Sequence, residues 1–203
     1  MLNRILAIFL LVGVFAGIAS TAHAQSSADQ RAEEVRALLQ ERDREIKRVL
    51  GSGDAYTAEQ REQLKDVVNS GIDYEAMGRT ALGPFWTDIT PAKRARFVDV
   101  FGSIVRNQSL SNLDVYRSSV TYEEVDVEGD SARVVTATVY KDVPTEVVYV
   151  MGFEDDQWRV QDIILDDVST AEGYARSFQT VVRKRGFDAL MESLTRKLDS
   201  MSS

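Results

Sequence analysis

The chain has 203 residues, of which 24 are basic and 32 acidic, so its formal net charge at pH 7 is −8; it contains no cysteine and one histidine. The lack of cysteine excludes disulfides and thiol nucleophiles, and because His23 lies in an N-terminal segment that we expect to be removed, zinc sites of the usual kind and Ser-His-Asp catalysis are excluded as well. The acidic balance makes nucleic acid a poor partner, since phosphate binding requires concentrated Lys and Arg.

The N-terminus has the pattern of a secretion signal. Arg4 supplies a positive charge, residues 5–18 form an apolar run, and Ala22-His23-Ala24 has the small residues of a cleavage site. The apolar run is shorter than the roughly 20 residues that span a bilayer. We therefore expect cleavage after Ala24 and release of the mature chain after export, with an uncleaved anchor as the alternative.

The predicted domains follow from this cleavage: residues 1–24 are a signal peptide and residues 25–203 form a single domain, long enough to bury its own core. Loss of Arg4 leaves 23 basic and 32 acidic residues, a net charge of −9. A chain of this charge is not expected to adhere to anionic membranes by net charge alone. We therefore expect it to meet membranes through protein partners.

Helices are predicted over about 28–113. Apolar residues recur at helical spacing from 28 to 50, and a glycine at position 51 follows. The starts of three further helices follow from capping patterns, namely Thr57 with Gln60, Asp73, and Thr90 before Pro91. Leu110 and Leu113 are expected to extend the fourth helix.

The period then changes from helix to strand over about 115–166, where Val, Tyr and Thr are frequent. Short turns separate four predicted strands, at residues 115–127, 132–140, 146–153 and 158–165. Short turns imply an antiparallel, twisted sheet. Two C-terminal helices follow over about 169–199, the first capped by Ser169 with Glu172, so the fold class is α+β with helices packed against a sheet.

Blocks of sequence in a particular order carry a resemblance to a known family. They are Asp73-Tyr74-Glu75-Ala76-Met77-Gly78-Arg79, Leu82-Gly83-Pro84-Phe85-Trp86, residues 90–97, residues 158–169, residues 174–178 and residues 186–190. This order resembles the toluene-tolerance proteins, the periplasmic carrier of the ABC-type system that maintains outer-membrane lipid asymmetry. The sequence departs from the family pattern at Asp167 or its neighbour, where glycine is usual, at Thr170, where leucine is usual, and at Gly173, where asparagine is usual.

The resemblance implies an NTF2-like twisted sheet packed against several helices, with an apolar pocket between them for acyl chains. It implies a phospholipid as cargo, no cofactor and no catalytic residue. The implied partners are an inner-membrane ABC transporter complex with its lipid-binding subunit and an outer-membrane lipoprotein–porin complex. The carrier itself is expected to be a monomer.

Aromatic, methionine and aliphatic side chains suit such a pocket because they tolerate variable acyl chains. Alternation places Tyr149 with Met151 on one face of a strand, and Trp158, Val160 and Ile164 on one face of the next. Any of these side chains could equally be ordinary core. The expected lipid-binding residues are Tyr74, Met77, Phe85, Trp86, Phe97, Phe101, Val105, Tyr149, Met151, Trp158, Val160, Ile164, Tyr174 and Phe178.

Other readings stay open at this stage. The cargo could be a rigid, hopanoid-like lipid, or the chain could be a solid interaction module. An NTF2-like isomerase or hydratase would use Asp162, placed by alternation beside Trp158 and Val160, as a general base; a structural carboxylate is the favoured interpretation. The basic residues Arg79, Lys93, Arg94 and Arg96 could meet lipid phosphates, although a solvated face is favoured.

Overall fold

A computed structural model describes residues 18–53, 56–110 and 113–201. Most of the predicted signal peptide lies outside these residues, and helix α1, which starts at Ile18, continues through the predicted cleavage site. The elements in chain order are α1 (Ile18–Leu50), α2 (Ala58–Asn69), α3 (Tyr74–Leu82), α4 (Phe85–Asp88), α5 (Pro91–Ser109), the 3-10 helix η1 (Leu113–Arg117), β1 (Val120–Glu128), β2 (Ser131–Tyr140), β3 (Val143–Glu154), β4 (Gln157–Leu165), β5 (Val168–Ser169), α6 (Thr170–Arg185) and α7 (Phe187–Met201). The α+β class is confirmed.

The predicted caps begin four of these helices. The Thr57 hydroxyl accepts the Gln60 N–H at 3.1 Å while the Gln60 side chain accepts the Thr57 N–H at 3.0 Å, so the capping box of α2 is complete. The side chains that accept the first free N–H groups of α3, α5 and α6 are those of Asp73, Thr90 and Ser169. Each cap satisfies a backbone donor that the helix itself leaves unpaired.

The strands form one antiparallel sheet in the order β1-β2-β3-β4-β5. Three of its turns place two successive non-glycine residues at positive φ: Lys141 with Asp142, Asp155 with Asp156, and Asp166 with Asp167. The last of these turns contains Asp167, at or beside which the resemblance leads us to expect glycine, the residue that adopts positive φ most readily. Aspartate tolerates this conformation better than most residues do.

Three boundary predictions are wrong. The third strand, predicted from 146 after a break containing Pro144, starts at Val143, and Pro144 pairs with Val139. Val115 and Tyr116 belong to η1, and the first strand starts only at Val120. Helix α5 ends at Ser109, so Leu110 and Leu113 do not extend it. In the last two cases residues with strand or helix character fill a short connection, where packing decides the conformation.

A β-bulge changes the face on which part of β4 lies. Val150 pairs with Asp162, but the next residue, Met151, pairs with Val160, so Gln161 is an extra residue in the strand. A bulge reverses the alternation beyond it. The expectation that Asp162 and Ile164 share the face of Trp158 and Val160 is therefore wrong, and Ile163 takes the place of Ile164 on that face.

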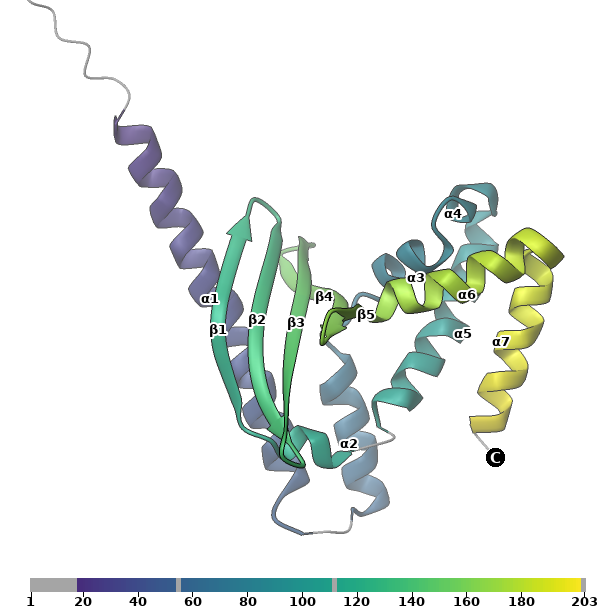
Figure 1. Cartoon of the computed structure of the whole chain (residues 1–203), viewed down its shortest axis with the longest axis horizontal. Helices are drawn as coiled ribbons and strands as arrows, with labels where there is room; N and C mark the ends of the chain where they lie inside the picture. Colours follow the sequence, from purple (N-terminus) through teal and green to yellow (C-terminus); the bar gives the residue numbers. More distant parts are fainter. Residues whose placement is uncertain (1–17, 54–55, 111–112, 202–203) are drawn as a thin grey trace, which may run out of the picture.

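Figure 1 shows two regions of different construction. In the sheet region, comprising α1 and β1–β4, helix α1 crosses behind the strands and packs through Val35 against one face, which we call the inner face. In the helical region, comprising α3–α7, the helices pack on one another around a separate apolar core. A smaller core joins α1 and α2 to η1 through Leu50, Leu64 and Leu113. The regions meet where the Asp73 N–H donates to the Val160 carbonyl at 2.8 Å.

Candidate functional site

Twelve of the fourteen expected lipid-binding residues are divided between two separate apolar clusters of the described chain. The helical core contains Met77, Trp86, Phe97, Phe101, Val105 and Phe178, with Tyr74 and Tyr174 packed on it. The inner face of the sheet holds Tyr149, Met151, Trp158 and Val160. Phe85 and Ile164 belong to neither core. The candidate site is therefore sought where the apolar surface stays open.

Aromatic rings fill the helical core. Phe97 and Phe101 stack with ring centroids 5.4 Å apart, and the Phe178 ring meets both edge-on at 6.0 and 5.8 Å. Tyr174 closes the cluster against Phe101 at 5.0 Å. Rings in these arrangements are in van der Waals contact, so this core is built for stability.

The inner face of the sheet is closed at one end. Met151 and Val160 pair there and are only 1 % and 6 % exposed. Beyond them the guanidinium of Arg31 lies over the rings of Phe153 and Trp158, at 4.7 and 5.0 Å from their centroids. Arg31 is itself held by Asp130 at 3.2 Å. Helix α1 thus covers this end.

At the other end of the inner face, Val134 and Thr136 of β2 are buried, but the edge formed by β3 and β4 is only partly covered. The two pairs that follow Met151 and Val160 on this face are Tyr149 with Ile163 and Val147 with Leu165. Tyr149, Ile163 and Val147 are half-buried and Leu165 is 47 % exposed. We call these four residues the open strip. Three half-buried apolar residues that lead to an exposed leucine make this strip a candidate contact for a ligand or partner.

Two more exposed apolar residues extend the open strip at its edge. Val143, on the inner face of β3 by alternation, is 59 % exposed, and Val168, which pairs with Leu165, is 57 % exposed. Burying a valine or leucine side chain contributes about 1.5–3 kcal/mol. A tail laid over the strip would gain that contribution from several residues at once.

Three tyrosines connect the open strip to the helical region. Tyr149 of the strip, Tyr116 of η1 and Tyr74 of α3 lie within electrostatic range of one another in that order. Burial raises the pKa of Tyr74 and Tyr149, and it raises the pKa of Tyr116 to about 12, with Tyr149 adding to the effect. All three are neutral at physiological pH.

The hydroxyls of these tyrosines differ in their hydrogen bonds. Tyr74 donates to Asn69 Oδ1 at 2.8 Å and Tyr116 donates to the Ser109 carbonyl at 3.1 Å. Within the described part of the chain, Tyr149 has no such partner. Its hydroxyl remains able to donate to an oxygen of a bound molecule.

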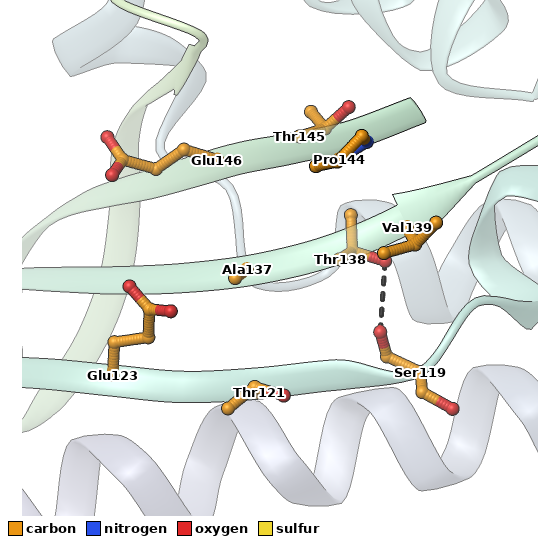
Figure 2. Close-up of a pocket in the computed structure, with 9 residues that line it drawn as sticks. All are labelled: Ser119, Thr121, Glu123, Ala137, Thr138, Val139, Pro144, Thr145 and Glu146. Carbon is orange, nitrogen blue, oxygen red and sulfur yellow. Dashed lines mark hydrogen bonds between the residues drawn. The ribbon is translucent and has the colours of Figure 1, made fainter. Parts of the chain in front are cut away.

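Two open grooves occur away from the expected residues. The first, of about 610 Å³, lies on the outer face of the sheet, and Figure 2 shows its lining from β1, β2 and β3. Thr121, Ala137 and Glu146 sit side by side there, and the Thr138 hydroxyl donates to the Ser119 carbonyl at 3.0 Å. Glu123 and Glu146 place two carboxylates in this lining, which makes it a poor surface for acyl chains. The second groove, of about 510 Å³, lies between α5 and α7.

Asp162 has a structural role. Its Oδ1 accepts the N–H groups of Ile163 and Ala171, each at 2.9 Å, and its Oδ2 accepts the Ser169 hydroxyl at 2.5 Å. These bonds tie the start of α6 to β4. The carboxylate acts as an anchor for a helix and is committed to three donors, so it is poorly placed to abstract a proton.

Trp158, in contrast to Asp162, has a polar group without a hydrogen-bond partner among the described residues. Its ring is buried, yet its Nε1–H donates to no residue that the structure describes. A buried donor without an acceptor costs about 1–3 kcal/mol, and the oxygen of a bound molecule or water would relieve that cost.

Other site types are not seen in the described ranges. No three His, Cys, Asp or Glu side chains come together there as metal ligands. Among residues 18–53, 56–110 and 113–201, no helix combines the length and apolarity needed to traverse a bilayer.

Sequence reasoning found Tyr149 but missed the other members of the open strip and Tyr116. Alternation from Tyr149 would have added Val147. Ile163 could not be predicted from the sequence, because no residue type indicates the bulge at Gln161. Tyr116 was assigned to a strand that starts later.

The comparisons with known proteins agree with the fold. A sequence model of the family described as "MlaC protein" matches residues 40–196. A solved structure of a phospholipid-binding protein from Ralstonia solanacearum, in complex with a phospholipid, aligns with a TM-score of 0.69 and 21 % identity, over 83 % of this chain and 97 % of that one. A search of curated proteins finds no match.

Proposed function

Because this chain belongs to the MlaC family of periplasmic, non-enzymatic phospholipid carriers, we propose that it holds the acyl chains of its phospholipid along the open strip of Val147, Tyr149, Ile163 and Leu165. The observation that carries the proposal is the contrast within one sheet face. The face is closed at Met151 and Val160 and uncovered at Leu165.

The physical need for such a surface is set by methylene groups. Each costs roughly 0.8 kcal/mol in water, so a diacyl lipid with about 30 of them faces a cost on the order of 20 kcal/mol in crossing an aqueous gap. A carrier lowers this cost by covering the tails with apolar side chains. The surface that covers the tails must be about as apolar as a bilayer, because a carrier that bound lipid much more tightly than the bilayer does could not unload it.

The residues around the open strip suit both ends of such a ligand. Tails lying on the strip would displace water from it. They would also keep that water further away from the tyrosines of the helical region. Tyr149 offers a hydroxyl donor to ester or phosphate oxygens. The residues of the helical core, from Met77 to Phe178, would then stabilise the fold next to the site and would not contact the tails in this conformation.

The setting of this activity is part of the proposal. Cleavage after Ala24 would release the chain to the periplasm. There it would exchange lipid with an inner-membrane ABC transporter complex and an outer-membrane lipoprotein–porin complex. A hopanoid-like cargo is the second candidate, because an open apolar strip also accepts a rigid polycyclic lipid.

The test uses two valines of the same sheet. Val147→Asp places a carboxylate in the open strip, and Val139→Asp places one at a position of the outer face that is 57 % exposed. We expect the phospholipid extracted per protein to fall at least tenfold for Val147→Asp and to stay unchanged for Val139→Asp, since burying an unpaired charge against tails costs several kcal/mol.

A milder variant guards against misfolding. Val147→Thr keeps the shape of valine and adds one hydroxyl, so it should fold and retain less lipid than the wild type. Circular dichroism confirms the fold of each variant before extraction. Wild-type lipid content in folded Val147→Asp and Val147→Thr would place the tails elsewhere.

A further inference from the structure

The charges of the molecule are separated between its two regions. Residues 113–169, which include all the strands, carry 14 acidic and 4 basic side chains, a net charge of −10. The helical segments 74–109 and 170–201 carry 7 acidic and 11 basic side chains, a net charge of +4. A chain with an overall negative charge therefore has one positive end.

The positive charge gathers where α6 turns into α7. Arg183, Lys184 and Arg185 form the last turn of α6, all exposed, and Gly186 ends the helix. Helix α5 starts beside this turn, because Lys93 pairs with Asp188 at 2.7 Å and lies over the ring of Phe187. Arg96 and Arg196 line the groove of about 510 Å³ that lies between α5 and α7. We call Lys93, Arg96, Arg183, Lys184, Arg185 and Arg196 the basic corner.

Most of these charges are not neutralised within the protein. Lys93 is paired with Asp188, and Arg196 with Glu192 at 2.8 Å. Arg96, Arg183, Lys184 and Arg185 form no ion pair with any residue described here. The dipole of α6 favours cations at its last turn, which accounts for Arg183, Lys184 and Arg185 in part, but Arg96 lies within α5 and gains nothing from that dipole.

The corner also projects from the molecule. In Figure 1 the turn between α6 and α7 lies at the far end of the helical region, away from the strands. A flat negative surface can thus approach the corner while the acidic sheet region points away from it. The half-buried Phe187 and the buried Met191 form an apolar floor among the basic side chains.

We propose that the basic corner docks the protein on the anionic surface of a lipid bilayer. Each Lys or Arg close to an anionic leaflet adds to the attraction, and the attraction fades within a Debye length of about 8 Å at physiological salt. The acidic sheet region, lying beyond that length, would repel the surface only weakly. The net charge of the whole chain is thus the wrong guide to its membrane contact. The proposal rests on the carrier function for its purpose, but it is measured independently of it.

The experiment is flotation of the purified mature chain with two kinds of vesicle at an ionic strength of about 0.15 M, where the Debye length is short. One kind contains phosphatidylcholine alone, and the other contains phosphatidylglycerol and phosphatidylcholine in equal parts. We expect binding to the anionic vesicles only, and loss of that binding in high salt. Equal binding to both vesicles, or binding to neither, overturns the proposal.

Charge reversals locate the contact. Lys184→Glu with Arg185→Glu is expected to weaken anionic-vesicle binding about tenfold, and Arg96→Glu, on a different helix, several-fold. The matched control, Arg133→Glu with Arg159→Glu in β2 and β4, changes the net charge as much as the first variant but should weaken binding less than twofold. An equal loss in the control overturns the corner assignment, because net charge alone would then explain the data.

Two further readouts separate this inference from others. Extracted phospholipid per protein should stay at the wild-type level in all charge variants, so a failure of the carrier proposal is seen independently. Thermal unfolding checks that Arg96→Glu is folded. If corner variants impair lipid delivery in cells although wild-type protein ignores anionic vesicles, the proposal is overturned in favour of an acidic protein partner.

Discussion

The helical region and the sheet region use their apolar residues in different ways. In the helical region Phe97, Phe101 and Phe178 are buried and their rings pack against one another. In the sheet region α1 covers one end of the inner face. At the other end Val147 is half-buried and Leu165 is exposed. The comparison separates apolar side chains that stabilise the fold from those available to a ligand.

The sharpest test of this contrast is a pair of truncations. Phe101→Ala removes a fully buried ring and should lower the free energy of unfolding by about 3–5 kcal/mol. Ile163→Ala removes a half-buried side chain of the open strip and should cost about 1–2 kcal/mol in lipid-free protein. Urea denaturation measures both. Equal costs would mean that the strip is ordinary core, and the contrast would be lost.

Asp162→Asn tests the junction between the regions. The amide keeps one acceptor oxygen for the Ile163 and Ala171 N–H groups, but it cannot accept the Ser169 hydroxyl as Oδ2 does. We expect a loss of about 1–2 kcal/mol of stability, since hydrogen bonds to charged groups are the stronger ones.

The same variant distinguishes a structural carboxylate from a catalytic one. Lipid binding and biological activity should persist in Asp162→Asn at temperatures where it is folded. Asp167→Asn, in an exposed turn, is the control and should change stability by less than about 0.5 kcal/mol. Loss of activity in a folded Asp162→Asn protein would speak against the anchor role.

Tyr116→Phe probes the tyrosines between the two regions. Deleting its hydroxyl removes a hydrogen bond to Ser109, which is worth about 1 kcal/mol at neutral pH. Burial raises the pKa of Tyr116 from 10.0 to about 12, so the unfolded chain ionises first as the pH rises. The stability that depends on neutral Tyr116 is thus present below pH 10 and is lost between pH 10 and about 12.

The measurement is unfolding by urea across that pH range. The wild type should lose more stability between pH 10 and 12 than Tyr116→Phe does, because the variant lacks the group that titrates. Parallel curves for the two proteins would show that Tyr116 is well solvated, which would contradict its burial between the open strip and the helical region.

Local rules were enough to predict most of the elements from sequence. The caps at Thr57, Asp73, Thr90 and Ser169 each involve residues three apart in the chain, so their chemistry is visible in a short window. The strands that follow one another through short turns are visible for the same reason. Even Pro144, expected in a break, only marks the start of β3, where it pairs with Val139 near the hairpin end.

The site was harder to predict because it depends on which residues of the sheet the rest of the chain leaves uncovered. Met151 and Val147 look alike in sequence, and only the path of α1 and Arg31 seals one and leaves the other half-exposed. The many aromatic residues of α5 and α6 suggested pocket walls, but their rings pack against one another. The bulge at Gln161, which puts Ile163 in the strip, arises from pairing between strands.

The most direct test of the central claim is native mass spectrometry of the mature wild-type chain purified from its cell envelope, followed by extraction and identification of what is bound. We predict one diacyl phospholipid per chain, released when the protein is denatured. A rigid polycyclic lipid in its place would contradict the proposed cargo, and protein that is wholly free of lipid would contradict the account of the open strip itself.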